Sequence, residues 1–148
     1  MHVSYEVRAG DFSNAGNVSS TVKGIMKKLG ITPVDIKRII VALYEAEVNV
    51  VAHSFGGEIS CEIEPESVDI VVADTGPGIP DLELAMTEGW STATPEVREM
   101  GFGAGMGLVN ISRCVDHMKL ESVWGKGTRL KMRLYLDNEH NNVKETEN

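Results

Sequence analysis

The sequence predicts an α+β two-layer sandwich, in which helices cover one face of a mixed, mostly antiparallel sheet. Three observations support this fold class: two successive segments with helical spacing, two pairs of strand-like segments joined by short turns, and a glycine-rich stretch between those pairs. Strands joined by hairpin turns pair antiparallel, which leaves the helices to cover one face. The 148 residues suit a single domain over 1–136, and we expect the polar stretch 137–148 to be a disordered tail.

The N-terminal part reads as one strand followed by two helices. Apolar and polar residues alternate over 3–7, which predicts a half-buried strand. Apolar residues then recur at helical spacing over 15–29, and Asp11 and Ser13 are candidate caps for this helix. The threonine–proline pair at 32–33 predicts the start of a second helix, with threonine at the N-cap and proline in the first turn.

The remainder reads as two hairpins separated by glycine-rich segments and a helix. The expected elements are strands at 58–64, 68–73, 118–123 and 128–136 and helices at 81–87 and 106–116. Between those two helices, 88–104 contains glycine, proline, serine and threonine without periodicity, which is typical of a mobile loop.

Composition excludes several functional classes. The 22 acidic residues outnumber the 14 basic ones, and a formal charge of −8 opposes nucleic-acid binding, which depends on basic contacts to phosphates. Cys61 and Cys114 form no CxxC pair, and Cys61 alternates with apolar residues as a buried strand thiol does. No segment resembles a signal peptide or a membrane span, so we expect a cytoplasmic protein that binds no membrane.

Glu45 and Asn49 are the first candidate site residues. They are four residues apart on the second expected helix, which puts their Cβ atoms about 5–6 Å apart on one face. An asparagine oxygen suits Mg²⁺, and a glutamate can polarise a nucleophile. Taken alone, the pair is also what a solvated helix face contains, and that alternative stays open.

Two glycine-rich segments are further candidates. The segment 74–79 has the sequence Asp-Thr-Gly-Pro-Gly-Ile and directly follows an apolar strand. Its aspartate can accept a hydrogen bond from a ligand amino group, its glycines let the backbone approach a flat ring, and a plain turn is the alternative. Glycines alternate over 101–107 ahead of a helix, where free N–H groups suit a polyphosphate. This segment matches neither the Walker nor the Rossmann pattern.

The order of these motifs is more specific than any one of them. Glu-x-x-x-Asn on a helix is followed by Asp-x-Gly-x-Gly-Ile, by Gly-x-Gly-x-Gly-Leu and by Gly-x-Gly-Thr at 125–128. In this order the chain resembles the Bergerat-fold ATPases (gyrase, the Hsp90 chaperones, histidine kinases and MutL) over about residues 3–136. The resemblance implies the Bergerat ATP-binding fold, with ATP and Mg²⁺ as cofactors.

The resemblance also implies a role for each matching residue. Glu45 would be the general base, and Asn49 would ligate Mg²⁺ at the nucleotide phosphates. Asp74 would hydrogen-bond the adenine amino group, with Thr128 nearby, directly or through water. The other residues implied to bind the nucleotide are Gly76, Gly78, Ile79, Gly103, Ala104, Gly105, Met106, Gly107 and Leu108. The segment 88–104 would be the lid over ATP.

Within this superfamily the chain is similar to the free-standing branch. Gyrase and MutL types need a second domain that donates a lysine, and histidine kinases carry an upstream helical domain, neither of which we expect here. The free-standing branch contains the anti-sigma-factor kinases and the stressosome switch kinase. It implies an ATP-dependent serine/threonine protein kinase that phosphorylates a small STAS-domain antagonist, with a sigma factor or another regulator as a further partner.

Two other functions stay open at this point. One is a nucleotide-gated anti-sigma or regulatory binding module with little or no turnover, and the other is a plain ATPase. Anti-sigma kinases often place an arginine just before the glycine loop, whereas the nearest arginine here is Arg98, several residues earlier, so its contact with the γ-phosphate is undecided. Homodimers are common in this branch, although no interface is legible in the sequence.

Overall fold

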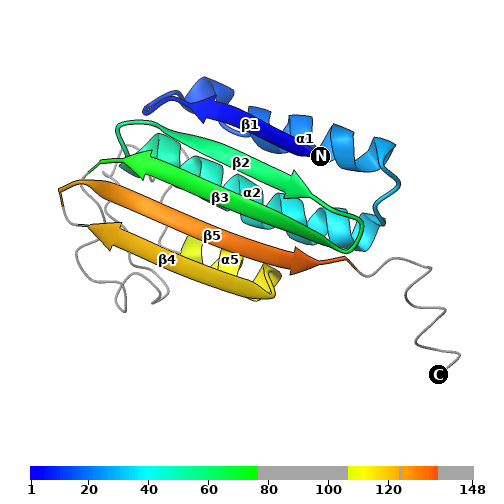
Figure 1. Ribbon diagram of the computed structural model, residues 1–148. Coiled ribbons are helices and arrows are strands. Elements are labelled where there is room, and N and C mark those ends of the chain that lie inside the picture. Colours follow the sequence, from blue (N-terminus) through cyan, green and yellow to red (C-terminus); the bar gives the residue numbers. More distant parts are fainter. Residues whose placement is uncertain (77–106, 124, 137–148) are drawn as a thin grey trace, which may run out of the picture.

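The computed structural model describes residues 1–76, 107–123 and 125–136. Its elements in chain order are β1 (His2–Val7), the 3₁₀ helix η1 (Phe12–Asn14), α1 (Asn17–Lys28), α2 (Pro33–His53), β2 (Gly57–Ile63), β3 (Ser67–Thr75), α5 (Gly107–Cys114), β4 (His117–Val123) and β5 (Gly127–Tyr135). The helices cover one face of the sheet, which confirms the predicted α+β two-layer sandwich (Figure 1). The helix expected at 81–87, the loop 88–104 and the tail 137–148 lie outside the described residues.

The five described strands lie in the order β1-β2-β3-β5-β4. All four neighbouring pairs are antiparallel, so this part of the chain has no parallel pair of the kind that a mixed sheet would include. Because β3 pairs with β5 over its whole length, the ends of these two central strands are in fixed register. That register places Asp74 opposite Thr128.

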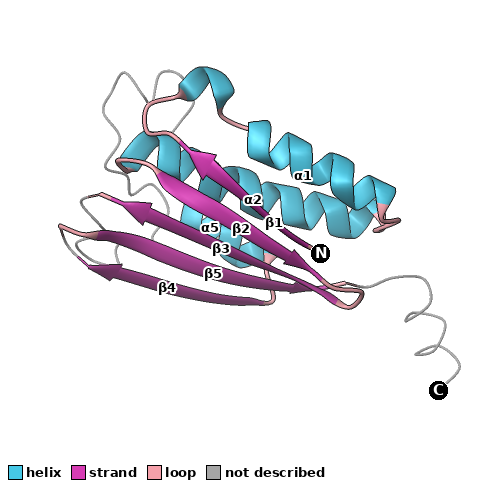
Figure 2. Cartoon of the chain, turned by 45° about the horizontal axis from the view of Figure 1, so that its top comes forward, coloured by secondary structure: helices cyan, strands magenta, loops and turns pink. Residues whose placement is uncertain are grey.

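Alternation along each strand decides which side chains face the helices. On β3, Val68, Ile70 and Val72 are buried beneath the helix layer, and Asp74 continues the same phase. The intervening residues face away from the helices. α2 is the central helix and packs between α1 and α5 (Figure 2). The functional candidates on α2 are therefore held over the middle of the sheet.

The start of α2 matches the sequence prediction. The Thr32 hydroxyl accepts a hydrogen bond from the Asp35 N–H at 3.4 Å, and Pro33 is the first helical residue. One turn later, Arg38 donates to the backbone carbonyls of Tyr135 at 2.7 Å and Cys114 at 3.2 Å. These bonds attach the start of α2 to the ends of β5 and α5.

The start of α1 differs from the sequence prediction, because neither Asp11 nor Ser13 caps it. The Asp11 carboxylate instead accepts two hydrogen bonds from the Asn14 side chain at 2.9 and 3.0 Å, beside η1. The N-cap residue of α1 is Gly16, whose φ of 97° favours glycine. A side chain from α2, Glu47, takes the place that the sequence predicted for a local cap.

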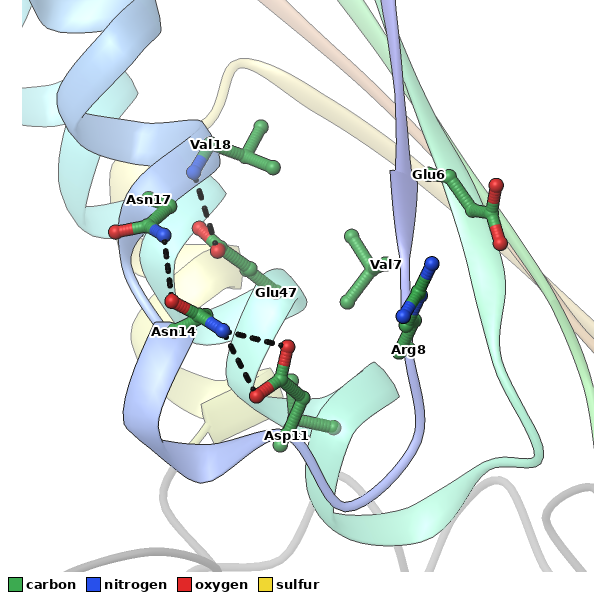
Figure 3. A pocket seen from close by; sticks show the side chains of 9 residues that line it. Glu6, Val7, Arg8, Asp11, Asn14, Asn17, Val18 and Glu47 are labelled. Atoms are coloured by element: carbon green, nitrogen blue, oxygen red, sulfur yellow. Dashed lines mark hydrogen bonds between the residues drawn. The ribbon is translucent and has the colours of Figure 1, made fainter.

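Glu47 is only 2% exposed and caps α1 from the neighbouring helix (Figure 3). Its Oε2 accepts from the N–H groups of Gly16 at 2.9 Å and Val18 at 3.2 Å. Its Oε1 accepts from the N–H and hydroxyl of Ser19 at 3.1 and 2.8 Å. A buried carboxylate is tolerable here because four donors and the positive end of the helix dipole surround it. This cluster locks α1 onto α2, and the hollow beside it in Figure 3 has a volume of about 350 Å³.

Cys61 is a buried strand thiol, as the sequence predicted. The Cys61 side chain is fully buried in β2, and burial raises the pKa of its thiol to about 12. Cys114 is partly buried and packs against the core at the end of α5. Among the described helices, none is both long and apolar enough to cross a membrane.

Candidate functional site

Glu45 and Asn49 form the first cluster of the candidate site. Both lie in the second half of α2, and both are half-buried rather than fully solvated. Oε1 of Glu45 accepts a hydrogen bond from the side-chain amide of Asn110, on α5, at 3.2 Å. This bond fixes the orientation of the carboxylate, so the alternative of a freely solvated helix face does not describe Glu45.

The glycine that begins α5 lies against this pair. A Cβ atom on Gly107 would lie 3.2 Å from Oδ1 of Asn49, 3.3 Å from its Nδ2 and 3.3 Å from Oε2 of Glu45. Only a residue without a side chain therefore leaves the carboxylate and the carboxamide in their places. The structure thus brings together two motifs that are almost sixty residues apart in the sequence.

Asp74 and Thr128 form the second cluster, at the end of the two central strands. The Thr128 N–H donates to Oδ1 of Asp74 at 3.1 Å, and the Thr128 hydroxyl shares a hydrogen bond with the Ser122 hydroxyl at 3.1 Å. Burial raises the pKa of Asp74 to about 6, and the Thr128 hydrogen bond only partly opposes that rise. A carboxyl group whose ionisation is disfavoured by burial in this way is a candidate for ligand binding.

Two glycines allow the backbone to pack closely around Asp74. A Cβ on Gly127 would collide with the Asp74 carbonyl oxygen, and a Cβ on Gly76 would lie 3.1 Å from Cα of Ser54. The N–H of Gly76 donates to the carbonyl of Lys126 at 3.2 Å. Glycines at both positions let three chain segments meet tightly beside the carboxyl group.

Both clusters lie at the same end of the molecule. The Phe55 N–H donates to the Thr75 carbonyl at 2.7 Å, and the Thr75 N–H donates to the Gly56 carbonyl at 3.0 Å, so the end of α2 is attached to the end of β3. Asn49 lies one turn before that end of α2, and Asp74 faces the helix layer. Figure 1 shows the ends of α2 and β3 meeting at one edge of the sandwich.

Reasoning from the sequence missed one member of the site, Asn110. Several predicted members lie outside the described residues. Asn110 carries no role in the motif pattern, and only its place one turn into α5 hints that it faces α2. Leu108 is partly buried and packs against the core, and its contact with a nucleotide stays a prediction. The predicted site residues outside the described part of the chain are Gly78, Ile79, Gly103, Ala104, Gly105 and Met106, together with Arg98.

The chain matches a family model described as "Histidine kinase-, DNA gyrase B-, and HSP90-like ATPase" over residues 34–139. Since this match spans well over half of the 148 residues, the chain belongs to this family of ATPase domains, as the sequence motifs predicted.

Two relatives within this family have sequences similar to this chain. The chain is 33% identical over 113 residues to the serine/threonine-protein kinase RsbT of Bacillus subtilis (strain 168), which covers 74% of this chain and 79% of RsbT. It is 31% identical over 121 residues to the anti-sigma F factor of Clostridium novyi (strain NT), which covers 78% of this chain and 81% of that factor.

Solved structures show the same fold. The crystal structure of the RsbU and RsbW domains of Rv1364c from Mycobacterium tuberculosis superposes with a TM-score of 0.63, covering 93% of this chain and 33% of that chain. The mycobacterial sensor histidine kinase MprB superposes with a TM-score of 0.52, covering 92% of this chain and 98% of that chain. Both are 16% identical to this chain, so they support the fold and no finer property.

Proposed function

We propose that this chain is an ATP-dependent serine/threonine protein kinase that phosphorylates a STAS-domain protein in a partner-switching pathway. The observation that carries the proposal is the convergence of Glu45 and Asn49 on Gly107, the first residue of α5. Family membership supports ATP as the nucleotide, and the names of two relatives, a serine/threonine kinase and an anti-sigma factor, support the pathway.

The residues present suit a nucleotide with Mg²⁺. Asn49 would ligate the metal through its carboxamide oxygen, and Mg²⁺ commonly takes only one or two protein ligands and completes its shell with phosphates and water. Asp74 and Thr128 would hold the adenine, since the Asp74 carboxylate can accept the amino group. Gly107 would lie beside the phosphates at the N-terminus of α5, where backbone N–H groups favour negative charge. Bound MgATP would supply the phosphoryl group and neutralise the charge that develops during transfer.

Glu45 would act on the partner's hydroxyl group. Because Asn110 occupies Oε1, the second oxygen, Oε2, is the one directed toward Gly107. Oε2 would take the proton of the partner's serine or threonine as its oxygen bonds to the γ-phosphorus, while ADP departs with the electron pair of the broken phosphorus–oxygen bond. The half-buried position of Glu45 limits competition from water.

The test is phosphoryl transfer from γ-labelled ATP and Mg²⁺ to purified STAS-domain proteins of the source organism. We expect label on a serine or threonine with the wild-type chain, and a loss of at least a hundredfold with Glu45→Ala, whose ADP affinity should be retained. Glu64→Ala is the matched control, since Glu64 is exposed in the turn after β2. Unchanged transfer by Glu45→Ala would reject the assigned base.

A nucleotide-gated binding module is the second candidate, and the relationship to anti-sigma F factors favours it. In that case the chain would bind a sigma factor or another regulator in one nucleotide state and turn over little ATP. Pull-downs in ATP, in ADP and without nucleotide separate the two candidates. If a partner binds equally in all three states while label appears on the STAS-domain protein, the binding module is rejected and only the kinase function remains.

A further inference from the structure

The helices α1, α2 and α5 expose charge of one sign only. Their exposed charged residues are all basic, namely Lys23, Lys27, Lys28, Lys37 and Arg113. The acidic residues of these three helices are Asp35, Glu45 and Glu47, and none of them is exposed. The whole chain has a formal charge of −8, so this helix layer reverses the overall charge locally. It therefore suits an anionic partner, although the chain as a whole does not.

Local helix chemistry accounts for some of these cations but not for Lys23 and Lys37. Lys27, Lys28 and Arg113 lie in the last turns of their helices, where positive charge complements the helix dipole. Lys37 lies just after the first turn of α2, at the end where the dipole disfavours a cation. Neither Lys23 nor Lys37 forms an ion pair with the described residues. These two lysines therefore have no role in holding their own helices together.

Lys23 and Lys37 lie at one level of the seam between α1 and α2. A short connection joins these two helices, which pack side by side and run antiparallel (Figure 2). Gly16 of α1 meets Tyr44 of α2 in this seam, since a Cβ on Gly16 would lie 3.3 Å from the Tyr44 ring. Seven residues make about two turns and return to the same helix face, so both lysines lie two turns from that contact in one direction. Their like charges repel each other unless an anion lies between them.

An exposed apolar line runs along α2 beside the two lysines. Val34 is 72% exposed, Val41 36% and Tyr44 40%. Val34, Val41 and Glu45 are separated by seven and then four residues, so they follow one line along the helix. This line extends over three turns, about 16 Å, and ends at the Glu45 carboxylate. A single exposed valine is ordinary, whereas a line of apolar groups that leads to the candidate base suits a docking partner.

We propose that an acidic, amphipathic helix of the protein substrate docks along the surface of α1 and α2. This surface, the α1–α2 seam, is formed by Lys23, Val34, Lys37, Val41 and Tyr44. The docked helix lies along α2 with its apolar side on the valines and the tyrosine and with a carboxylate between the lysines. Amphipathic helices bind grooves in this way, through anchors at helical spacing. Docking here brings the substrate protein to the end of α2 that carries Glu45.

The α1–α2 seam suits a protein helix better than other anionic partners. An anionic lipid surface or a nucleic acid extends beyond the seam and meets the net negative charge of the rest of the chain, whereas a short acidic helix contacts the seam alone. The apolar line ends at Glu45, where the proposed function needs a protein hydroxyl group. The inference rests on the proposed kinase function for the identity of the docked protein, and on charge and exposure for the surface itself.

Charge reversal in the seam tests the proposal with the purified STAS-domain proteins of the source organism. For Lys23→Glu/Lys37→Glu we expect at least tenfold weaker binding in the presence of ADP and at least a tenfold higher KM in phosphoryl transfer. Its kcat and its ADP affinity should stay at the wild-type values, because neither lysine lies in the nucleotide site. Glu45→Ala should show the opposite pattern, with binding retained and transfer lost. If the reversal unfolds the chain in circular dichroism, Lys23→Gln/Lys37→Gln replaces it and should weaken binding in the same direction.

The matched control, Lys119→Glu/Lys131→Glu, reverses two exposed lysines that lie opposite each other on β4 and β5. They lie on the sheet face that turns away from the helices, so this variant should bind and transfer like the wild type. Val34→Ser/Val41→Ser tests the apolar line and should weaken binding at least threefold. A photo-cross-linking phenylalanine derivative at position 41 should cross-link to the STAS-domain protein, whereas the same group at position 131 should not.

The outcomes separate the docking surface from the kinase function. A STAS-domain protein that cross-links at position 41 and binds through the lysines, yet takes no label, would support the seam and reject the kinase. A protein that takes label with an unchanged KM in the lysine variant would overturn the seam and keep the kinase. Vesicles of phosphatidylserine and phosphatidylcholine that bind the wild type but not the lysine variant, with unchanged binding of the STAS-domain protein, would assign the seam to a membrane instead. Neither binding nor label with any STAS-domain protein would overturn both proposals.

Discussion

The backbone N–H of Thr128 donates a 3.1 Å hydrogen bond to the carboxylate of Asp74, across the paired ends of β3 and β5. This bond holds an acidic side chain on the helix-facing side of the sheet, where burial raises its pKa to about 6. The same end of the molecule carries Glu45 and Asn49 beside Gly107. Five measurable consequences follow from this arrangement and from the helix contacts that support it.

Nucleotide affinity should depend on the charge of Asp74. The charged carboxylate accepts the adenine amino group more strongly than the neutral acid does, so bound ADP favours the deprotonated form. Affinity should therefore be constant above about pH 7 and fall as the pH drops through 6, by up to about tenfold per pH unit. Calorimetric titration of ADP between pH 5 and 8 measures this, and an affinity that is flat across pH 6 would contradict the role of Asp74.

Asp74→Asn should stabilise the free protein near neutral pH. The pKa of Asp74 is raised in the folded state, so its charge costs stability above about pH 6, and that cost disappears as the pH falls toward the unfolded value of 3.8. Asparagine keeps an acceptor for the Thr128 N–H without the charge. We expect a gain on the order of 1 kcal/mol at pH 7.5, after allowing for the partial exposure of Asp74, and none near pH 4. Urea unfolding at the two pH values checks both the size and the sign.

Glu47→Ala should be strongly destabilising, because it leaves the N–H groups of Gly16, Val18 and Ser19 without their acceptor at a buried helix end. We expect a loss of about 3 kcal/mol, and a smaller loss for Glu47→Gln, which keeps one acceptor. Glu64→Ala, at an exposed turn, should change stability by less than about 0.5 kcal/mol. Equal urea midpoints for Glu47→Ala and Glu64→Ala would show that the cap contributes nothing.

Gly107→Ala should lower phosphoryl transfer far more than stability. The new Cβ would push the Glu45 carboxylate and the Asn49 carboxamide by a few tenths of an ångström, and Gly107 has no positive φ that alanine would strain. We expect transfer to fall roughly tenfold to a hundredfold, with less than about 1 kcal/mol of lost stability. Gly24→Ala is the control on α1. Its Cβ meets open space, so activity should stay and stability should rise by about 0.5–1 kcal/mol.

Local signals in the sequence predicted much of this fold. Alternation predicted β1 and β2, an apolar run predicted β3, and a hairpin turn predicted β4 and β5. The threonine–proline pair predicted the start of α2, and all of these signals depend on neighbours within a few residues. The cap of α1 was predicted wrongly, since its acceptor, Glu47, lies 28 residues beyond Ser19 on another helix. Backbone register, rather than composition, decides which strand residue faces Thr128, and only motif order identified Asp74.

In the candidate site, too, local sequence signals predicted some features and long-range packing decided the others. The spacing of Glu45 and Asn49 places both on one face of a helix, but it does not say what lies against them. Gly107 and Asn110 reach them only through the packing of α5 on α2, a contact between segments far apart in the sequence. Long-range packing, not local propensity, therefore distinguishes this candidate site from a solvated helix face.

The most direct test of a single nucleotide site is the titration of ADP, with and without Mg²⁺, into the wild-type chain and into Asn49→Ala and Asp74→Asn. The wild type should bind more tightly with Mg²⁺. Asn49→Ala should lose that gain and keep its Mg²⁺-free affinity, whereas Asp74→Asn should be weakened about equally, roughly tenfold or more, under both conditions. Three results would contradict a single nucleotide site at these residues. Asn49→Ala would keep the full gain in affinity with Mg²⁺, Asp74→Asn would bind ADP like the wild type, or the wild-type chain would bind no ADP.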